Sequence, residues 1–200
     1  MRPNLDRKLW KDNLTFCGVD EVGRGSLAGP VVAAAIILPR YSRIDGVKDS
    51  KELTPKQRAK LFEKIKSNAI SFGIGIVNHQ VIDKINISNA SFVAMKKAIA
   101  KLSPKPDFVI VDGFAIPDLP IANRGIIKGD KKSLSIASAS IIAKVTRDEI
   151  MIKFHRYYPV YGFEQHKGYP TRKHIEALKR YGPVTIHRQT YAPVRDCLER

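Results

Sequence analysis

The sequence lacks the features that mark membrane proteins and disulfide-stabilised proteins. Only two of its 200 residues are cysteines, and no apolar signal segment follows its first methionine. The longest apolar stretch, residues 30–39, has a proline at each end and falls short of the roughly 18 residues needed to span a bilayer. We therefore expect a soluble, cytoplasmic protein with no membrane partner, in which Cys17 and Cys197 are reduced thiols.

Several catalytic patterns are also missing. No group of cysteines and histidines has the spacing of a zinc site, and the Gly-x-Ser-x-Gly motif of serine hydrolases is absent. The glycines near residue 23 are too few for a dinucleotide-binding or Walker phosphate loop. These absences disfavour zinc chemistry and a Ser-His-Asp triad.

Negative charge is scarce. Nineteen aspartates and glutamates stand against 35 lysines and arginines, which gives a net charge of +16 and a pI of about 9.9. Such a balance favours a polyanionic partner through counterion release, although a basic surface with no single partner would have the same composition. The basic residues recur along the whole chain, which is typical of a folded surface.

Five apolar runs rich in β-branched residues are predicted to be strands, over residues 15–19, 31–38, 71–77, 107–111 and 125–128. The first two runs flank only a glycine-rich turn and should form an antiparallel hairpin, whereas the later runs alternate with predicted helices. The pattern predicts an α/β fold with a mixed β-sheet flanked by helices.

Capping residues predict where the helices begin. Thr54 and Gln57 form a capping box around Pro55, so a helix should run from there to about residue 68. Ser88 is expected to cap another helix, and a short one is expected around Val81. Residues 133–157 contain no glycine or proline and should form the longest helix, and a last helix should follow residue 171 and stop at 182.

Carboxylates stand at or just past three predicted strands. They are the pair Asp20 and Glu21, then Asp112, then Asp130. A buried aspartate is costly unless it is hydrogen-bonded, paired or bound to a metal, although an ordinary turn would explain any single one. Carboxylate oxygens suit Mg²⁺ or Mn²⁺, and two such ions can stabilise the attacking and leaving oxygens of a phosphodiester.

Two further segments suit contact with a nucleic acid. The glycines of Gly23-Arg24-Gly25 leave backbone groups uncovered, and Arg24 adds a fork that can bind phosphate, although a plain turn would use the same glycines. Tyr169 lies beside basic residues just before the last predicted helix. Its ring could stack on a base or sugar, or simply pack over the start of that helix.

These motifs occur in one order along the chain, as 18–25, 48–51, 111–113, 128–130, 138–148, 166–169 and 187–194. Together they resemble bacterial ribonuclease HII, of the type 2 ribonuclease H family, over roughly residues 16–194. The first motif and the motif 138–148 are highly specific.

The resemblance implies an RNase H-like mixed sheet with a small helical C-terminal extension. A single domain over residues 1–200 is expected, with a catalytic core at about 14–158 and a helical part at about 159–200. The implied enzyme is a monomeric endonuclease that hydrolyses the RNA strand of RNA/DNA hybrids and cuts 5′ of single ribonucleotides in duplex DNA. It would use Mn²⁺ or Mg²⁺, two ions with substrate bound, and leave a 3′-hydroxyl and a 5′-phosphate.

The resemblance also assigns roles to residues. Asp20, Glu21, Asp112 and Asp130 would be the catalytic, metal-binding carboxylates. Substrate would be bound by Gly23, Arg24, Gly25, Lys51, Ser133, Ser138 and Tyr169. Within that set, the glycine loop would contact the 2′-OH, Tyr169 would pack on the following deoxyribose, and the lysine and the serines would contact phosphates. A side chain introduced at Gly23 or Gly25 is expected to abolish cutting and leave the fold intact.

One geometric problem follows from the strand assignment. Adjacent strand residues point to opposite faces of a sheet, so Asp20 and Glu21 cannot both chelate from a regular strand. Either a bend intervenes, or Glu21 acts through its carbonyl group or a water. Two other functions remain open at this point: a metal-dependent nuclease of another acidic-residue group, such as an exonuclease, and a nucleic-acid-binding module that needs no divalent ion.

Overall fold

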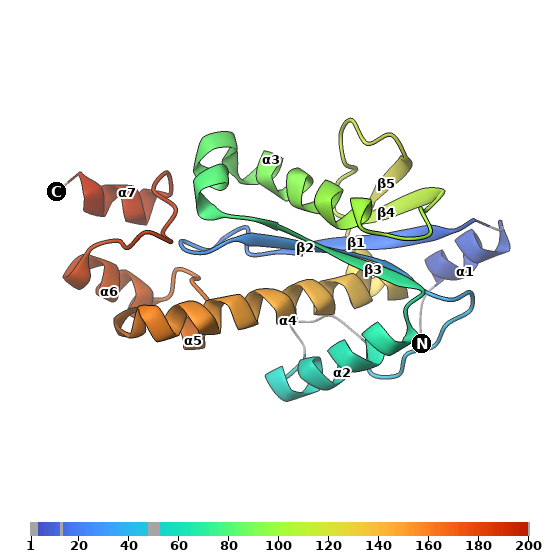
Figure 1. Cartoon of the computed structure of the whole chain (residues 1–200), viewed down its shortest axis with the longest axis horizontal. Helices are drawn as coiled ribbons and strands as arrows, with labels where there is room; N and C mark the ends of the chain where they lie inside the picture. Colours follow the sequence, from blue (N-terminus) through green and yellow to red (C-terminus); the bar gives the residue numbers. More distant parts are fainter. Residues whose placement is uncertain (1–3, 13, 48–52, 200) are drawn as a thin grey trace.

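A computed structural model of the chain describes residues 4–12, 14–47 and 53–199 (Figure 1). Its centre is one five-stranded sheet with the strand order β3-β2-β1-β4-β5. The strands are β1 (Phe16–Val22), β2 (Val31–Ile37), β3 (Ser71–Val77), β4 (Phe108–Asp112) and β5 (Ala122–Ile126). β1, β2 and β3 pair antiparallel, whereas β4 pairs parallel with both β1 and β5. The predicted hairpin and mixed sheet are therefore confirmed.

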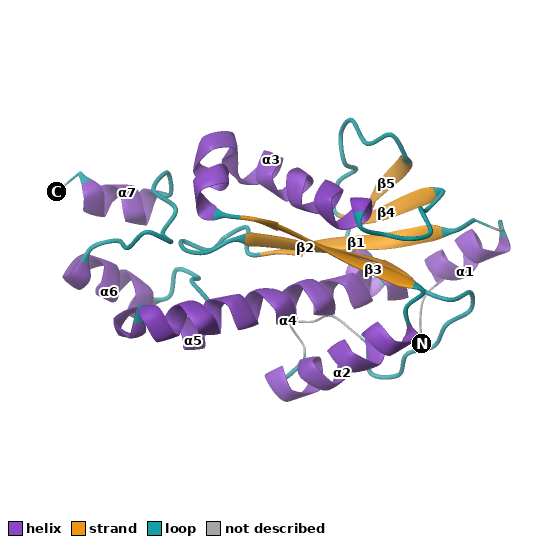
Figure 2. Cartoon of the chain, viewed as in Figure 1, coloured by secondary structure: helices purple, strands orange, loops and turns teal. Residues whose placement is uncertain are grey.

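Helices cover both faces of this sheet (Figure 2). They are α1 (Asn4–Lys11), α2 (Pro55–Asn68), α3 (His79–Ala100), α4 (Leu134–Tyr157), α5 (Phe163–His166), α6 (Arg172–Tyr181) and α7 (Ala192–Leu198), with short 3₁₀ turns η2 (Gly129–Lys131) and η3 (Pro159–Tyr161). Figure 1 shows α3 on one face, α4 and α2 on the other, and α5 to α7 beyond one end of the sheet. This last group is the small helical C-terminal extension.

The sheet is apolar on both faces because both are covered. All seven residues of β2 are buried, and their side chains alternate between two cores. Val32, Ala34 and Ile36 pack on the side of α2 and α4, whereas Val31 and Ala33 pack on the side of α3. A third cluster joins the end of α4 to the C-terminal helices.

Glycines bring two helices unusually close to the sheet. A Cβ atom added to Gly75 in β3 would lie 1.9 Å from the carbonyl oxygen of Ala94 in α3. One added to Gly18 in β1 would lie 2.3 Å from the carbonyl carbon of Ser135 in α4. The absence of a side chain at these strand positions therefore sets the spacing between the sheet and the two helices.

Most predicted helix ends are confirmed. Thr54 and Gln57 form the capping box of α2, Ser133 caps α4, and Thr171 caps α6. The assignment of a cap to Ser88 is wrong. The short helix around Val81 and the longer one after it both form, as the two halves of α3, and they meet at Asn86. The backbone of Asn86 is not helical, with φ of 64°, and its side chain accepts a hydrogen bond from the Asn89 amide at the start of the second half.

The last strand differs from its prediction, and three helices were not predicted. The last strand was expected over residues 125–128 but spans Ala122–Ile126. Lys128 cannot continue it because its backbone is left-handed, with φ of 54°, and it starts the turn η2. Helices α1, α5 and α7 were not predicted.

Two observations concern the cysteines and the helices. Cys17 and Cys197 form no disulfide. Within the described ranges, no helix has the length and apolarity required to cross a membrane.

Candidate active site

Two of the candidate carboxylates lie side by side at the centre of the sheet. Val19 pairs with Val111 across the parallel strands β1 and β4, so Asp20 and Asp112 follow as neighbours. Asp20 is only 7% exposed and accepts a hydrogen bond from the hydroxyl of Ser140 in α4. Burial, with the added charges of Glu21 and Asp112, raises the pKa of Asp20 well above its usual range. A second negative charge beside Asp20 is therefore unfavourable unless a cation balances it.

The turn η2 brings the third carboxylate to the same end of β4. The Gly129 amide donates a 2.6 Å hydrogen bond to Asp112 Oδ1, which fixes the start of the turn against the strand. Asp130 is the next residue, and both aspartates are half-buried. The left-handed conformation of Lys128 produces the reversal that makes this contact possible.

Glu21 is oriented differently. β1 keeps regular pairing with β2 through Val22, so no bend separates Asp20 from Glu21. The alternation of β1 places Glu21 on the α3 side, where it forms a 3.6 Å ion pair with Arg24. The Arg24 guanidinium also donates to the hydroxyls of Ser88 and Ser91 in α3. A bend in β1, one of the two explanations for how Asp20 and Glu21 could serve one metal site, is therefore not observed.

The donor set fits a hard divalent cation in kind. Carboxylate oxygens from β1, β4 and η2 are the ligands that Mg²⁺ and Mn²⁺ prefer. Nevertheless, in the part of the chain that the structure describes, no three His, Cys, Asp or Glu side chains converge closely enough to ligate one ion. The carboxylates would thus hold an ion only with water or phosphate oxygens completing its shell, as is usual for Mg²⁺.

The glycine loop after β1 faces outward at one position and inward at another. A Cβ atom on Gly25 would meet no atom within 4 Å. At Gly23, by contrast, φ is +97° and a Cβ atom would lie 2.2 Å from Arg147 Nε. The expectation that a side chain at Gly23 leaves the fold intact is therefore wrong, whereas the space around Gly25 is compatible with it.

Tyr169 is half-buried, and cations flank its ring. The guanidinium carbon of Arg147 lies 5.5 Å from the ring centroid, and the Lys144 ammonium lies 5.9 Å from it. Its carbonyl oxygen accepts a 3.0 Å hydrogen bond from His174 Nδ1. The ring is thus held by groups on α4 and the main chain by a group on α6.

Behind Tyr169 lies a buried histidine pair. His174 Nε2 and His187 Nε2 are 3.1 Å apart, and the Val184 amide donates to His187 Nδ1. His174 donates through Nδ1 to the Tyr169 carbonyl, so in the neutral ring its Nε2 carries no proton and can only accept. His187 Nε2–H must therefore be the donor between the two rings. Burial lowers the pKa of both histidines to about 4 and keeps them neutral near pH 7.

The remaining predicted contacts have less support. Ser133 is 1% exposed, and its hydroxyl accepts the Ile136 amide at the start of α4. Ser138 is fully buried. The structure gives neither hydroxyl access to a phosphate, so neither is carried into the proposed site. Lys51 lies outside the described residues.

Sequence reasoning missed Arg147, His174 and Arg188. All three are fully buried and hydrogen-bond to main-chain carbonyls near the glycine loop or Tyr169. Two of them lie inside the quoted motifs, at 138–148 and 187–194, and that position was the only signal.

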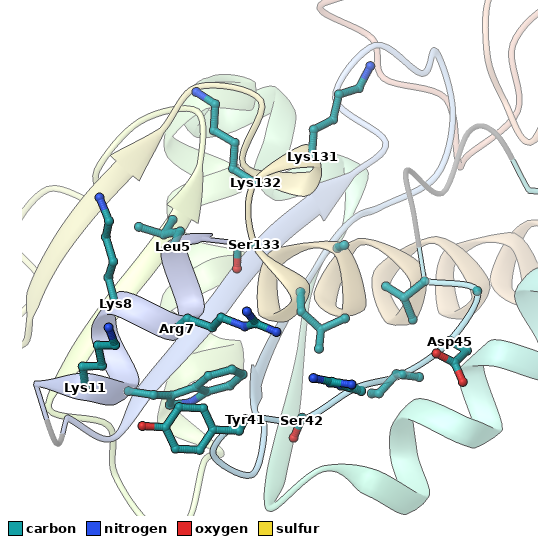
Figure 3. Close-up of a pocket in the computed structure, with 17 residues that line it drawn as sticks. Leu5, Arg7, Lys8, Lys11, Tyr41, Ser42, Asp45, Lys131, Lys132 and Ser133 are labelled. Atoms are coloured by element: carbon teal, nitrogen blue, oxygen red, sulfur yellow. The ribbon is translucent and has the colours of Figure 1, made fainter. Parts of the chain in front are cut away.

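A basic groove adjoins the turn that carries Asp130 (Figure 3). Its volume is about 1230 Å³, and it lies between α1, the segment after β2 and the first turn of α4. None of the four candidate carboxylates lines it. Basic side chains do, from Arg7, Lys8, Lys11, Arg43, Lys131 and Lys132. Figure 3 shows Lys131 of η2 and the next residue, Lys132, at the top of the view, and Lys8 and Lys11 of α1 at the left.

Comparison with known proteins gives one consistent result. The family model described as Ribonuclease HII matches residues 17–194. Ribonuclease HII of Caldicellulosiruptor bescii is 54% identical over 188 residues, which cover 94% of this chain and 91% of that protein. The crystal structure of ribonuclease H2 from Pyrococcus horikoshii superposes with a TM-score of 0.79 at 30% identity, covering 93% of this chain and 98% of the other. RNase HII from Archaeoglobus fulgidus, solved as a complex with PCNA, superposes with a TM-score of 0.73 at 26% identity, covering 89% of this chain and 95% of the other.

Proposed function

Because this chain belongs to the ribonuclease HII family and is a ribonuclease H, we propose that it cuts duplexes on the 5′ side of a ribonucleotide. The observation that carries the proposal is the pair Asp20 and Asp112 on adjacent parallel strands, with Asp130 on a turn tied to the second strand. Long RNA/DNA hybrids and single ribonucleotides embedded in duplex DNA are both substrates under this proposal.

The carboxylates bind the divalent cations. Asp20, Asp112 and Asp130 contribute side-chain oxygens from the end of the sheet that faces α4 and η2. Glu21 contributes through its carbonyl group or through a water, because its side chain lies toward α3 beside Arg24. When bound, Mg²⁺ or Mn²⁺ ions would supply the positive charge that stabilises the attacking and leaving oxygens of the phosphodiester.

The chain's other residues select and orient the substrate. The outward backbone of the glycine loop binds the 2′-OH, and Tyr169 packs on the sugar that follows. Water attacks the phosphorus, the bond to the 3′-oxygen of the preceding nucleotide breaks, and the products are a 3′-hydroxyl and a 5′-phosphate. The 2′-OH serves recognition and is not the nucleophile.

A blocked-end duplex tests this activity. The substrate is duplex DNA that contains one ribonucleotide and has both ends protected, so that an exonuclease cannot act on it. In Mg²⁺ the wild-type protein should give a single cut on the 5′ side of the ribonucleotide, with no cyclic phosphate. Removal of divalent ions with a chelator should stop the reaction, because the carboxylates alone supply no counter-charge to the phosphate.

Asp20→Asn, Asp112→Asn and Asp130→Asn supply the residue-level test. Each should lower the rate by at least about 100-fold while duplex binding persists, since each loses a ligand charge. A variant that cuts at the wild-type rate in saturating Mg²⁺ would remove that residue from the ligand set. The proposed activity would be refuted if the wild-type protein left the blocked duplex uncut, or if it degraded only duplexes whose ends are not blocked.

A further inference from the structure

Arg188 is a fully buried cation that binds main-chain carbonyl groups. Its guanidinium donates to the carbonyl oxygens of Gly23 at 2.7 Å, Arg24 at 2.9 Å and Gly29 at 3.0 Å. No carboxylate among the described residues forms an ion pair with it. A buried arginine with no carboxylate in direct contact is costly and is tolerated only when its donors are satisfied. Here two consecutive peptides of the glycine loop accept from it, together with the Gly29 carbonyl and the Tyr191 hydroxyl.

The orientation of those peptides follows from covalent geometry. In a trans peptide the carbonyl of one residue and the amide of the next point in opposite directions. The Gly23 and Arg24 carbonyls both point inward to one guanidinium, so the amides of Arg24 and Gly25 point away from it. A Cβ atom added to Gly25 would meet no atom within 4 Å, so the loop is not crowded at this residue. Two consecutive outward amides form a small concave site for an oxygen acceptor.

Tyr191 reinforces the same arrangement. Its hydroxyl accepts from Arg188 Nη1 at 3.0 Å and donates to the Arg24 carbonyl at 2.9 Å. The carbonyl of Arg24 therefore receives two hydrogen bonds, one from a cation. Hydrogen bonds to a carbonyl polarise the peptide and strengthen its own N–H as a donor.

The segment that carries Arg188 is itself anchored. The Arg188 amide donates to the Leu27 carbonyl, and the amides of Gln189 and Thr190 donate to the carboxylate of Asp83 in α3. The preceding residue, His187, belongs to the histidine pair behind Tyr169. The side chain of Arg188 thus reaches the glycine loop from a fixed backbone.

We propose that Arg188, assisted by the Tyr191 hydroxyl, is a positioning residue that aims the amides of Arg24 and Gly25 at the 2′-oxygen of the ribonucleotide. This inference rests on the proposed function. It assigns the discrimination between ribose and deoxyribose to a side chain 165 residues away in the sequence that does not touch the substrate. Without it, the two peptides are free to flip and lose the alignment of their donors.

Paired duplexes test the assignment. Binding is measured, with a chelator present, to two duplexes of one sequence that differ only in a single ribonucleotide. Arg188→Lys keeps the charge but loses the fork, and it should reduce the affinity ratio between the duplexes about 10-fold, as expected for lost charge-assisted hydrogen bonds. Tyr191→Phe should reduce it about threefold, as for one neutral hydrogen bond. Affinity for the all-DNA duplex should stay unchanged, and kcat/KM on the ribonucleotide substrate should fall with the ratio.

The matched control is Arg172→Lys, at an exposed arginine of the same C-terminal part. It should leave the ratio unchanged. Equal loss of affinity for both duplexes in Arg188→Lys and Tyr191→Phe would mean a merely structural role and would overturn the inference. Should Arg188→Lys fail to fold, Tyr191→Phe decides. If the wild-type protein distinguishes the duplexes and the variants do so equally well, this inference alone is overturned. If the wild-type protein neither distinguishes the duplexes nor cuts the one with the ribonucleotide, the proposed function is overturned as well.

Discussion

Tyr169 lies between cations and is fixed from two sides. Its ring is flanked by Arg147 and Lys144, and its carbonyl is bound by His174. Cation–π contacts and a buried hydrogen bond restrict both the ring and the main chain, so little entropy is lost when the ring meets a sugar. The tyrosine is therefore suited to sense the shape of a sugar.

The first prediction concerns that ring. Tyr169→Phe keeps the ring and should retain most activity, whereas Tyr169→Ala should lose about 5- to 150-fold, the range for an aromatic contact with a nucleic acid of about 1–3 kcal/mol. The loss should be larger on a duplex with a single ribonucleotide than on a continuous RNA/DNA hybrid, because a 2′-OH on the following sugar crowds the ring. Cleavage rates on the two substrates measure the difference. Equal losses on both would contradict the sensing of the RNA-to-DNA junction by Tyr169.

At the scale of elements, the contact between β3 and α3 is set by glycine. Gly75→Ala would place a Cβ atom 1.9 Å from the Ala94 carbonyl oxygen, and strand and helix would have to separate. We expect the free energy of unfolding to fall by about 2 kcal/mol or more, as for other overpacked sites. Urea unfolding measures it. Gly25→Ala, where the Cβ atom meets open space, is the control and should unfold like the wild type. If Gly75→Ala were as stable as this control, the strand and the helix would separate at no cost in free energy.

Elements with strong local signals were predictable from the sequence. The capping box at Thr54 and the proline-free stretch from 133 to 157 gave α2 and α4 to within a residue or two. Short elements were not predictable. α5 has four residues, and its ends are set by left-handed Gly162 and Lys167 in tertiary context and not by side-chain caps. The first half of the edge strand β5 contains the polar residues Asn123 and Arg124, so the apolar run in the sequence began later than the strand does.

The candidate site was predictable in its polar residues and not in their support. An aspartate after a buried strand is unusual on sequence alone, and Asp20, Asp112 and Asp130 stand out for that reason. Buried arginines and histidines give no such signal, because these residue types are common on surfaces. The donors of Arg147 and Arg188 reach segments far away in the sequence, and only the fold brings those carbonyls together.

At the scale of the whole molecule, the histidine pair makes stability depend on pH. The folded-state pKa of His174 and His187 is lowered from 6.5 to about 4. Between these values only the unfolded chain takes up protons at the two histidines. Their contribution to the free energy of unfolding is therefore complete above pH 6.5 and is lost as the pH falls toward 4. The loss is up to about 3 kcal/mol for each histidine. Urea unfolding between pH 7 and pH 4 measures it.

A variant isolates the effect of the pair. Burial raises the pKa of Asp6 and Asp20, so their protonation as the pH falls changes the free energy of unfolding in the opposite direction. His187→Gln should therefore be compared with the wild type at each pH, and its loss of stability per pH unit should be smaller by up to about 1.4 kcal/mol. Parallel curves for the two proteins would show that His187 is not responsible.

The net charge and the basic groove predict how binding responds to salt. If Lys8 and Lys11 contact phosphates of the flanking duplex, Lys8→Gln with Lys11→Gln should reduce the slope of log affinity against log salt by about 2, close to one per contact. Lys60→Gln with Lys64→Gln, on exposed positions of α2 outside the groove, is the control and should change it less. The site of cutting should stay the same in both. Equal slopes for the two double variants would exclude the groove from the duplex path.

Gly23 and Arg188 are 165 residues apart in the sequence, and this separation also determines the order in which they are synthesised. At translation rates of about 5–20 residues per second, roughly 10 to 30 seconds separate the synthesis of the loop from that of the arginine. During that interval the sheet can begin to form, but the carbonyls of Gly23 and Arg24 have no cation to orient them. Under the proposed role of Arg188, a nascent chain on the ribosome, surrounded by RNA, would acquire its selectivity for ribose last.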